Sequence, residues 1–551
     1  MKPVLPIFLN LVLAIGVVAQ VSRTLSDKDE TSATVDGTVV KEPGDQPLKK
    51  AIVQVVPDDE GGSSYTAVSD SEGSFGISSL QPGRYRIFVE RSGFIEVDKA
   101  GRRLPGTALS LQAGQHVKDL QLRMLPAAVI TGRVVDEDGD PMANVEISVL
   151  RYGYSSGHHE LQQERSERTN DVGEFRIGGL LSGRYFVSAS PAPDFTSAPP
   201  TKEPTENASK ADMGYVTTYY AGTSDRSQAT PLELHAGDEI PIDFTLVPTR
   251  TFRVRGSVAG ARGSGDARAV VMLHPKEFDE VFSAAEVDKD GNFEIRGVAP
   301  GSYTLTVMRS TGEAAQVSHQ DLEVVASDVK GLRLVPVQAS QIHGQLQIEN
   351  ARRLDLSQLA VLLRPKNGNN SGVVIGSEQG RVKPDGSFEL KDVSPGTYTV
   401  TIAGGSGSQR DYFLKKVVAG GRDVTDTGLV VPGGAAFSMS VIVSPSGPSI
   451  LGTVLDDKNQ PVGNATVVAV PDSAYREQLD RYQQAMTDQH GHFTLRGLSP
   501  GSYTLFAWDH VEEGAYYDPE FLKPFEHGGE PVHLAEGTRQ TVLLKALPAS
   551  N

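Results

Sequence analysis

The sequence predicts an all-β protein built from about five consecutive β-sandwich modules. The first observation behind this prediction is a block, Gly-x-Phe-x-Ile/Leu-x-x-Leu/Val-x-Pro/Ser-Gly-x-Tyr-x-aliphatic, that recurs five times with unchanged internal spacing. The second is a content of 57 Gly and 33 Pro in 551 residues, which suits many short strands joined by turns. Hydrophobic residues make up 38%, compatible with small sandwiches whose sheets each keep one face in water.

Each copy of the block predicts two strands joined by a turn. The Phe and the aliphatic residue two positions later share one face of a strand, and the Tyr begins the same alternation on the next strand. The Pro-Gly pair fits a tight turn with a positive φ at Gly, so we interpret the block as a β-hairpin. The copies span residues 73–87, 173–187, 291–305, 386–400 and 491–505.

Two further patterns frame every block. An aliphatic-x-Gly-x-aliphatic strand precedes it, at residues 35–39, 130–134, 254–258, 342–346 and 450–454. A strand–turn–strand pattern follows it, clearest at 109–122, 232–246 and 532–544. Each unit thus predicts six or seven short strands over ~90 to 120 residues, the size of a small sandwich.

The order of these motifs resembles the carboxypeptidase regulatory-like domain. The resemblance covers nearly all of residues 34–549, with modest departures at Ser182, which replaces Pro, and at Lys383, which replaces an Asp. It implies a seven-stranded, transthyretin-like (prealbumin-like or starch-binding-like) sandwich, repeated in a linear array. The family is widely used as a spacer and adhesion module, and arrays of this kind are similar to exported bacterial proteins.

The motifs also predict where the domains begin and end. The predicted ranges are a signal peptide at 1–19, a linker at 20–33, and sandwiches at 34–126, 127–249 with a long insertion, 250–337, 338–433 and 434–549 with an aromatic loop insertion. Short linkers that contain Pro, such as Leu125-Pro126 and Val335-Pro336, favour a semi-rigid rod.

The N-terminus predicts export. An apolar run from Val4 to Ala19 ends in Val17-Val18-Ala19, small residues suited to cleavage before Gln20. The alternative, a membrane anchor, requires a longer run. We therefore expect an exported protein (periplasmic, cell-surface or secreted) with no membrane span after signal removal. The absence of Cys excludes disulfides and favours a bacterial source.

The same sequence predicts no enzyme, cofactor or metal site. It has no Gly-x-Ser-x-Gly motif and no Cys nucleophile, and its net charge of −17 without a basic stripe argues against nucleic-acid binding. His490 and His492 with Asp488, or Asp288–Asn292, could contact a cation, but both stretches match turn positions of the repeat. Whether any module binds calcium stays open.

Aromatic residues in the two insertions are the only candidate ligand-binding residues. They are Tyr215, Tyr219 and Tyr220 in the second module and Trp508, Tyr516 and Tyr517 in the fifth. They could cover a sheet edge, contact a protein, or stack on sugar rings. We predict a non-catalytic structural or interaction protein (adhesion or scaffold) of the cell envelope that contacts an envelope or extracellular protein. The alternative is a carbohydrate-binding protein with a polysaccharide partner. Burial of Trp508 and Tyr516 would favour the first function, and a flat exposed face the second.

Overall fold

The structure, a computed structural model, is dominated by β-strands, which confirms the all-β class. It describes residues 32–58, 63–98, 101–104, 106–155, 157–191, 213–261, 269–276, 283–310, 315–349, 356–366, 379–404 and 412–548. Five segments of the described chain each enclose one large hydrophobic cluster between two sheets. We number these segments modules one to five in chain order. The clusters follow the five predicted sandwich ranges in order, but the cluster of module four includes Met439, Val441 and Val443, beyond the predicted end at 433, and that of module one begins at Ala33. The exact boundaries stay predictions.

Modules one and two each combine two sheets. In module one the strand orders are β2-β1-β9-β7, with β5 beside β1, and β4-β3-β6-β8. Its strands are β1 (Ala33–Lys41), β2 (Gln46–Pro47), β3 (Ile52–Pro57), β4 (Tyr65–Val68), β5 (Ser74–Leu80), β6 (Gly83–Glu90), β7 (Phe94–Val97), β8 (Thr107–Leu111) and β9 (His116–Pro126). In module two the orders are β13-β10-β18, with β19 also on β10, and β12-β11-β14-β16, with β17 also on β14. Its elements are β10 (Ala128–Val135), β11 (Glu146–Ser155), β12 (His158–Arg168), β13 (Glu174–Leu180), β14 (Gly183–Ser190), β15 (Met213–Gly214), β16 (Thr218–Tyr219), η1 (Arg226–Gln228), β17 (Leu232–Leu234), β18 (Glu239–Pro241) and β19 (Phe244–Thr245), and β15 pairs with β20 (Thr249–Arg250).

Modules three and four repeat this plan with different edge strands. Module three has the orders β24-β21-β27 and β23-β22-β25-β26-β28. Its strands are β21 (Phe252–Val258), β22 (Ala269–Pro275), β23 (Ser283–Glu286), β24 (Asn292–Val298), β25 (Gly301–Ser310), β26 (Ala315–Val324), β27 (Val329–Leu334) and β28 (Val337–Gln338). Module four has the orders β32-β29-β37-β34-β35 and β31-β30-β33-β36. Its elements are β29 (Ser340–Ile348), η3 (Leu356–Gln358), β30 (Leu359–Pro365), β31 (Gln379–Arg381), β32 (Ser387–Val393), β33 (Gly396–Gly404), β34 (Phe413–Ala419), β35 (Arg422–Asp423), β36 (Leu429–Val431) and β37 (Ala436–Ser444).

Module five carries most of the described helical turns. Its sheets have the orders β41-β38-β44 and β40-β39-β42-β43. Its strands are β38 (Ser449–Leu455), β39 (Thr466–Pro471), β40 (Gln483–Met486), β41 (His492–Leu495), β42 (Gly501–Trp508), β43 (Glu530–Leu534) and β44 (Arg539–Lys545). Its helices are η4 (Ser473–Tyr475), η5 (Leu479–Arg481), η6 (Ala515–Tyr517), α1 (Pro519–Leu522) and η7 (Lys523–Gly528). None of the helices among the described residues is long and apolar enough to cross a membrane.

The recurring Gly and Phe of the repeat face each other in all five modules. In module one Gly37 of β1 pairs with Phe75 of β5, and a Cβ on Gly37 would lie 2.8 Å from the Phe75 ring. Any larger residue would therefore displace the ring or the backbone. The equivalent pairs are Gly132 with Phe175, Gly256 with Phe293, Gly344 with Phe388, and Gly452 with Phe493.

The predicted hairpin within each block is wrong. In module one β5 pairs with β1, whereas β6 pairs with β3 and β8 of the opposite sheet, so the Pro-Gly turn links the two sheets. The positive φ falls at Ser79 before the turn and not at the Gly of the Pro-Gly pair. The Tyr85 hydroxyl donates to the Gln81 carbonyl (2.7 Å) and holds the turn, as the equivalent Tyr does in the other modules. The crossing brings the Phe and the Tyr into one core from opposite sheets.

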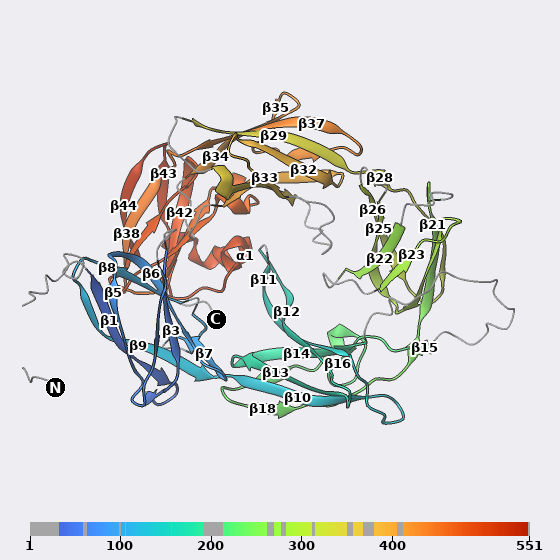
Figure 1. The fold of residues 1–551 in the computed structure, drawn as a ribbon, viewed down its shortest axis with the longest axis horizontal. Coiled ribbons are helices and arrows are strands. Elements are labelled where there is room, and N and C mark those ends of the chain that lie inside the picture. The colour runs from blue at the N-terminus through green and yellow to red at the C-terminus, as the bar shows by residue number, and fades with distance from the viewer. Residues whose placement is uncertain are drawn as a thin grey trace, which may run out of the picture.

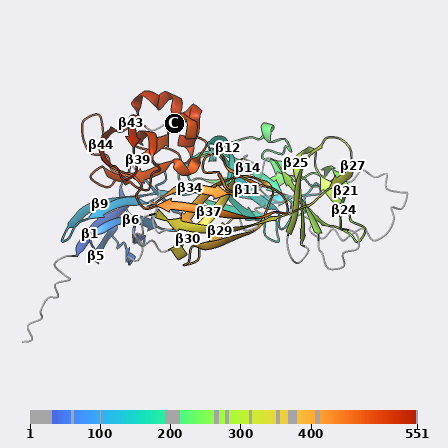
Figure 2. The same cartoon turned by 90° about the horizontal axis from the view of Figure 1, so that it is seen from above.

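The five modules form a closed ring and not the expected rod (Figure 1). They follow one another along the chain as predicted, but module five returns to modules one and two. The Asn464 side chain accepts a hydrogen bond from the Ala108 amide (3.2 Å), 356 residues away in sequence. Seen from above, the ring is flattened (Figure 2). Short linkers fix the distance between neighbouring modules but not the angle between them, and contacts of module five supply the closure.

Candidate functional site: the junction of modules one, two and five

The junction begins at the exposed edge of module one. Strand β8 is the edge strand of its sheet, so in the described part of the chain one row of its backbone groups faces no neighbouring strand. The Gln489 side chain of module five accepts from the Ser110 amide (3.0 Å) and donates to the Ser110 carbonyl (2.8 Å). Together with Asn464, it provides the hydrogen bonds that an additional strand would make. Two amide side chains thus join module five to module one.

A long hairpin of module two provides the second contact. Strands β11 and β12 pair from Glu146↔Arg168 out to Ser155↔His158 and reach toward α1 of module five (Figure 1). Near its tip, a Cβ on Gly157 would lie 2.8 Å from the Tyr517 carbonyl oxygen. From the other side, a Cβ on Gly514 would lie 2.9 Å from the Tyr154 carbonyl oxygen. Both glycines have a positive φ, so each serves its turn and also permits close approach of the two backbones.

The aromatic insertion of module five forms a small core of its own, which the hairpin joins. Its buried members are Val468, Val470, Tyr482, Phe506, Trp508, Val511, Ala515, Tyr516 and Leu522. Phe521, Phe525, Tyr517 and Leu547 pack against it, and so does Tyr154 from module two. The Tyr154 and Phe521 rings meet edge to face with centroids 5.9 Å apart. Arg151 and Glu512 add an ion pair at 3.7 Å.

The structure brings the predicted aromatic residues of module five together, with Trp508 and Tyr516 buried and Tyr517 partly buried. Trp508 is 0% exposed and Tyr516 is 2% exposed, so neither ring lies on an exposed stacking face. Their burial matches the first interpretation, in which they cover a sheet, and the covering extends to module two. The predicted tyrosines of module two, Tyr215, Tyr219 and Tyr220, lie apart from this group. Tyr219 is buried against Leu150 and Leu161.

The other two predicted tyrosines, Tyr215 and Tyr220, pack against the core of module two. The Tyr215 hydroxyl donates to Glu137 (2.7 Å), which raises the pKa of Tyr215 to about 12, chiefly through that hydrogen bond. Sequence reasoning missed the junction residues Tyr154 and Gln489. The only local signal was the pair of glycines around Tyr154 in a strand-rich stretch.

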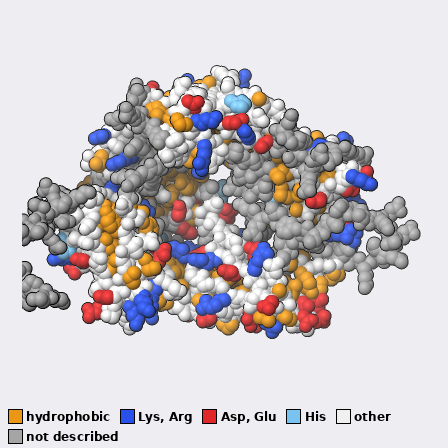
Figure 3. All heavy atoms as spheres, viewed as in Figure 1, with side chains coloured by type: hydrophobic (Ala, Val, Ile, Leu, Met, Phe, Trp, Pro, Cys, Tyr) orange, Lys and Arg blue, Asp and Glu red, His pale blue; other side chains and the backbone are white. Residues whose placement is uncertain are grey.

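A cavity of about 1680 Å³ lies where the three modules meet. Figure 3 shows basic and acidic side chains interspersed around the hollow at the centre of the ring. Several of the lining charges are paired, including Arg102 with Asp98 (2.7 Å) and Arg103 with Glu164 (3.8 Å). The Arg103–Glu164 pair connects module one to module two. The cavity therefore carries alternating charge and no strong field of one sign.

Glu96 on strand β7 is a buried carboxyl group in the wall of this cavity. It is 9% exposed, and its Oε2 accepts a hydrogen bond from the Val89 amide (3.0 Å). Burial raises the pKa of Glu96 to about 7, and the hydrogen bond from Val89 opposes the shift only in part.

We expect Glu96→Gln to stabilise module one at alkaline pH. Because the pKa is raised above the ordinary 4.5, the contribution of Glu96 to stability is complete below about pH 4.5 and lost as pH rises through about 7. The loss is of the order of 3 kcal/mol, at about 1.4 kcal/mol per pKa unit. Amide exchange of module one at pH 5 and pH 8 measures it. Glu90→Gln, at an exposed position of β6, is the control. If the Glu96→Gln variant kept the pH dependence of the unaltered chain, this assignment would be contradicted.

The turn residues considered as cation ligands are occupied by backbone hydrogen bonds. Asp488 Oδ1 accepts from the His490 and His492 amides, each at 2.9 Å. Asp288 and Asp70 form the same turn in modules three and one. Among the described residues no group of three or more His, Cys, Asp or Glu is arranged to hold a metal ion. The recurrence of the turn explains why these positions carry Asp.

The paired sheets define this protein as a chain of β-sandwich domains. Comparison with known proteins shows which domain family these sandwiches match. The carboxypeptidase regulatory-like domain family matches residues 34–124, 129–207 and 449–513. The three matched regions fall in modules one, two and five. These are also the modules that meet at the junction. A search of curated proteins finds no match.

Several solved structures are similar at low identity. The Bacillus anthracis TIE protein is 13% identical, with 56% of this chain and 51% of that chain covered and a TM-score of 0.17. GBS52, the minor pilin of Streptococcus agalactiae, is 12% identical, with 40% and 96% covered and a TM-score of 0.20. BcpA, the major pilin subunit of Bacillus cereus, is 11% identical, with 76% and 99% covered and a TM-score of 0.14. This chain spans about half the length of the TIE protein. Likenesses at these TM-scores carry no argument about function.

Proposed function

We propose that this chain is an exported, non-catalytic structural or interaction protein of the cell envelope whose modules act as one closed body. The observation that carries the proposal is the junction itself. Trp508 and its neighbours, the residues best suited to a ligand site, contact another module of the same chain. These side chains stabilise the contact between two modules and so fix the shape of the ring. A fixed shape is the property that a scaffold or adhesion protein needs.

The proposal does not extend to carbohydrate binding by the predicted aromatic residues. Sugar stacking requires an accessible ring face, and the rings of Trp508 and Tyr516 lie inside the small core of module five. A partner in the envelope or outside the cell would instead meet the outer surfaces of the ring. Module three, which lies away from the junction, offers such a surface.

The export part of the proposal has a direct test. The predicted signal peptide lies outside the described residues. N-terminal sequencing of the protein recovered from its producing cells should begin at or near Gln20, and cell fractionation should place it outside the cytoplasm. A cytoplasmic protein that retains residues 1–19 would contradict the proposal.

A further inference from the structure

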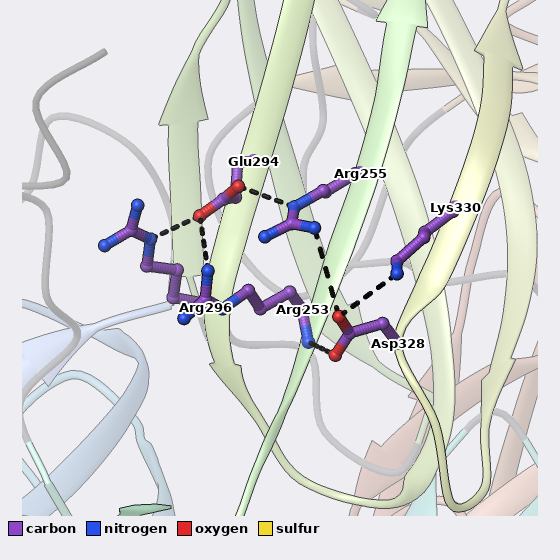
Figure 4. A network of polar contacts seen from close by, with 6 residues as sticks. All are labelled: Arg253, Arg255, Glu294, Arg296, Asp328 and Lys330. Atoms are coloured by element: carbon purple, nitrogen blue, oxygen red, sulfur yellow. Dashed lines mark hydrogen bonds and ion pairs between the residues drawn. The ribbon is translucent and has the colours of Figure 1, made fainter. Parts of the chain in front are cut away.

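A group of charged side chains lies on the outer face of the sheet β24-β21-β27 in module three (Figure 4). The group consists of Arg253 and Arg255 on β21, Glu294 and Arg296 on β24, Lys330 on β27, and Asp328 just before β27. Side chains alternate along a strand, and the intervening Val254 and Ile295 belong to the core of the module. The charged side chains therefore face outward.

Two carboxylates hold four cations in this group. Glu294 accepts from the Arg255 Nε (2.6 Å) and from Arg296, and Arg253 lies 3.8 Å away. Burial alone would raise the pKa of Glu294, but the hydrogen bonds from Arg255 and Arg296 outweigh it and the pKa is lowered. Asp328 pairs with Lys330 (3.8 Å) and with Arg255 (4.0 Å). Four positive and two negative charges leave an excess of two positive charges on this face.

This excess is notable in a chain of net charge −17. The carboxylates hold the guanidinium groups in fixed orientations, which lowers the entropy cost of binding a further anion. Guanidinium groups match carboxylates with two parallel hydrogen bonds. The Arg296 and Lys330 side chains are exposed enough to make such contacts. The face thus suits an acidic ligand.

The sandwich fold does not require these residues. The four other modules have the same Gly–Phe pairing, yet the positions equivalent to Arg255 are Asp36, Thr131, His343 and Leu451. Module four retains a reduced version, in which His343 and Lys391 flank Glu389 at 3.9 Å and 3.4 Å. Because the fold forms without the network, its presence in module three calls for another role.

The edge of the same sheet offers room for one more strand. In modules one and four the last strand has a further neighbour, β7 beside β9 and β34 beside β37. In module three, within the part of the chain that the structure describes, β27 pairs only with β21. Val325 and Val335, on either side of β27, are 75% and 56% exposed. Lys330 at this edge disfavours pairing with a basic strand and favours an acidic one.

We propose that the outer face and the β27 edge of module three dock an extended acidic segment of a partner polypeptide. The backbone of the segment adds to β27, and alternate carboxylates meet Lys330 on β27 and Arg255 on the adjacent β21. An acidic polysaccharide could pair with the positive charges but could not form the backbone hydrogen bonds of an added strand. The open edge of β27 therefore favours a peptide.

The proposal can be tested by measuring the binding of short labelled peptides to the mature full chain. Fluorescence anisotropy at low and at physiological salt gives the affinities. A peptide of alternating Glu and Val should bind, and more weakly as salt screens the charges. Its Lys–Val counterpart should not bind, nor should a Glu–Pro peptide, which cannot pair with a strand. Equal binding of the Glu–Pro peptide, or tighter binding of a polyuronate chain, would overturn it.

Two variants locate the site. Lys330→Gln, at a highly exposed position, and Arg255→Gln should each weaken binding of the Glu–Val peptide about tenfold, the loss expected for a charge-assisted hydrogen bond. His343→Gln, the equivalent of Arg255 in module four, is the matched control and should bind as the unaltered chain does. Amide exchange of module three confirms folding of each variant. Unchanged affinity in both module-three variants, or equal loss in the control, would refute the assignment.

Discussion

Replacing Tyr154 and Gln489 together by Ala is expected to open the ring. The double variant removes the edge-to-face contact with Phe521 and both hydrogen bonds to Ser110. An aromatic pair contributes ~0.5–1.5 kcal/mol and each hydrogen bond about 1 kcal/mol, so closure loses a few kcal/mol. The modules themselves keep their cores, because neither side chain belongs to one of the five large clusters.

The absence of Cys makes the opening straightforward to measure. Two introduced cysteines, one in module one and one in module five, accept a pair of fluorescent labels, and the distance between the labels should increase in the double variant. Small-angle scattering should show a larger maximum dimension. Tyr152→Ala is the control, because this residue lies on the same hairpin but contacts His159 and Phe186 of its own module. An unchanged distance in the double variant would mean that other contacts close the ring.

Phe293→Ala is expected to unfold module three while module one stays folded. Phe293 is buried and covers Gly256, and truncating a buried Phe costs ~3–5 kcal/mol, a large part of the stability of one domain. The hydrophobic clusters of modules two and four share no residue with the cluster of module three. The loss of stability should therefore stay within module three. Hydrogen exchange mapped along the chain measures it.

The control for this variant is Val325→Ala, since Val325 is largely exposed. Its protection pattern should match that of the unaltered chain. If Phe293→Ala removed protection from every module at once, the ring would be a single cooperative unit and the domain ranges given above would be wrong.

The core of the repeat could be predicted from the sequence because its pattern is local. Phe75 and Tyr85 recur at fixed spacing and belong to one core, and Gly37, which recurs at a variable distance upstream, pairs with Phe75. The path between the two strands of the block could not be predicted in the same way. A Pro-Gly turn has the same sequence whether it joins neighbours in one sheet or links two sheets, and only the pairing of β5 with β1 distinguishes them.

The junction was beyond sequence reasoning for a different reason. Gln489 and Ser110 are 379 residues apart, and a single glutamine beside an edge strand leaves no pattern in the sequence. Trp508 was singled out as the only Trp of the chain, but it is the last residue of strand β42 and not part of the insertion that follows. Whether such a residue faces solvent or a small core depends on the partner surface, here the hairpin with Tyr154.

The closed ring also sets how the protein would respond to tension. The described chain starts in module one and ends in module five, the two modules that touch. A pull on the two ends would load the junction first, before any sheet: the Asn464 and Gln489 hydrogen bonds and the contact of Tyr154 with Phe521. Once these contacts part, the ring would extend into an arc with every sandwich intact. Opening of the ring would thus increase the end-to-end distance of the protein reversibly, at forces well below those that unfold a module.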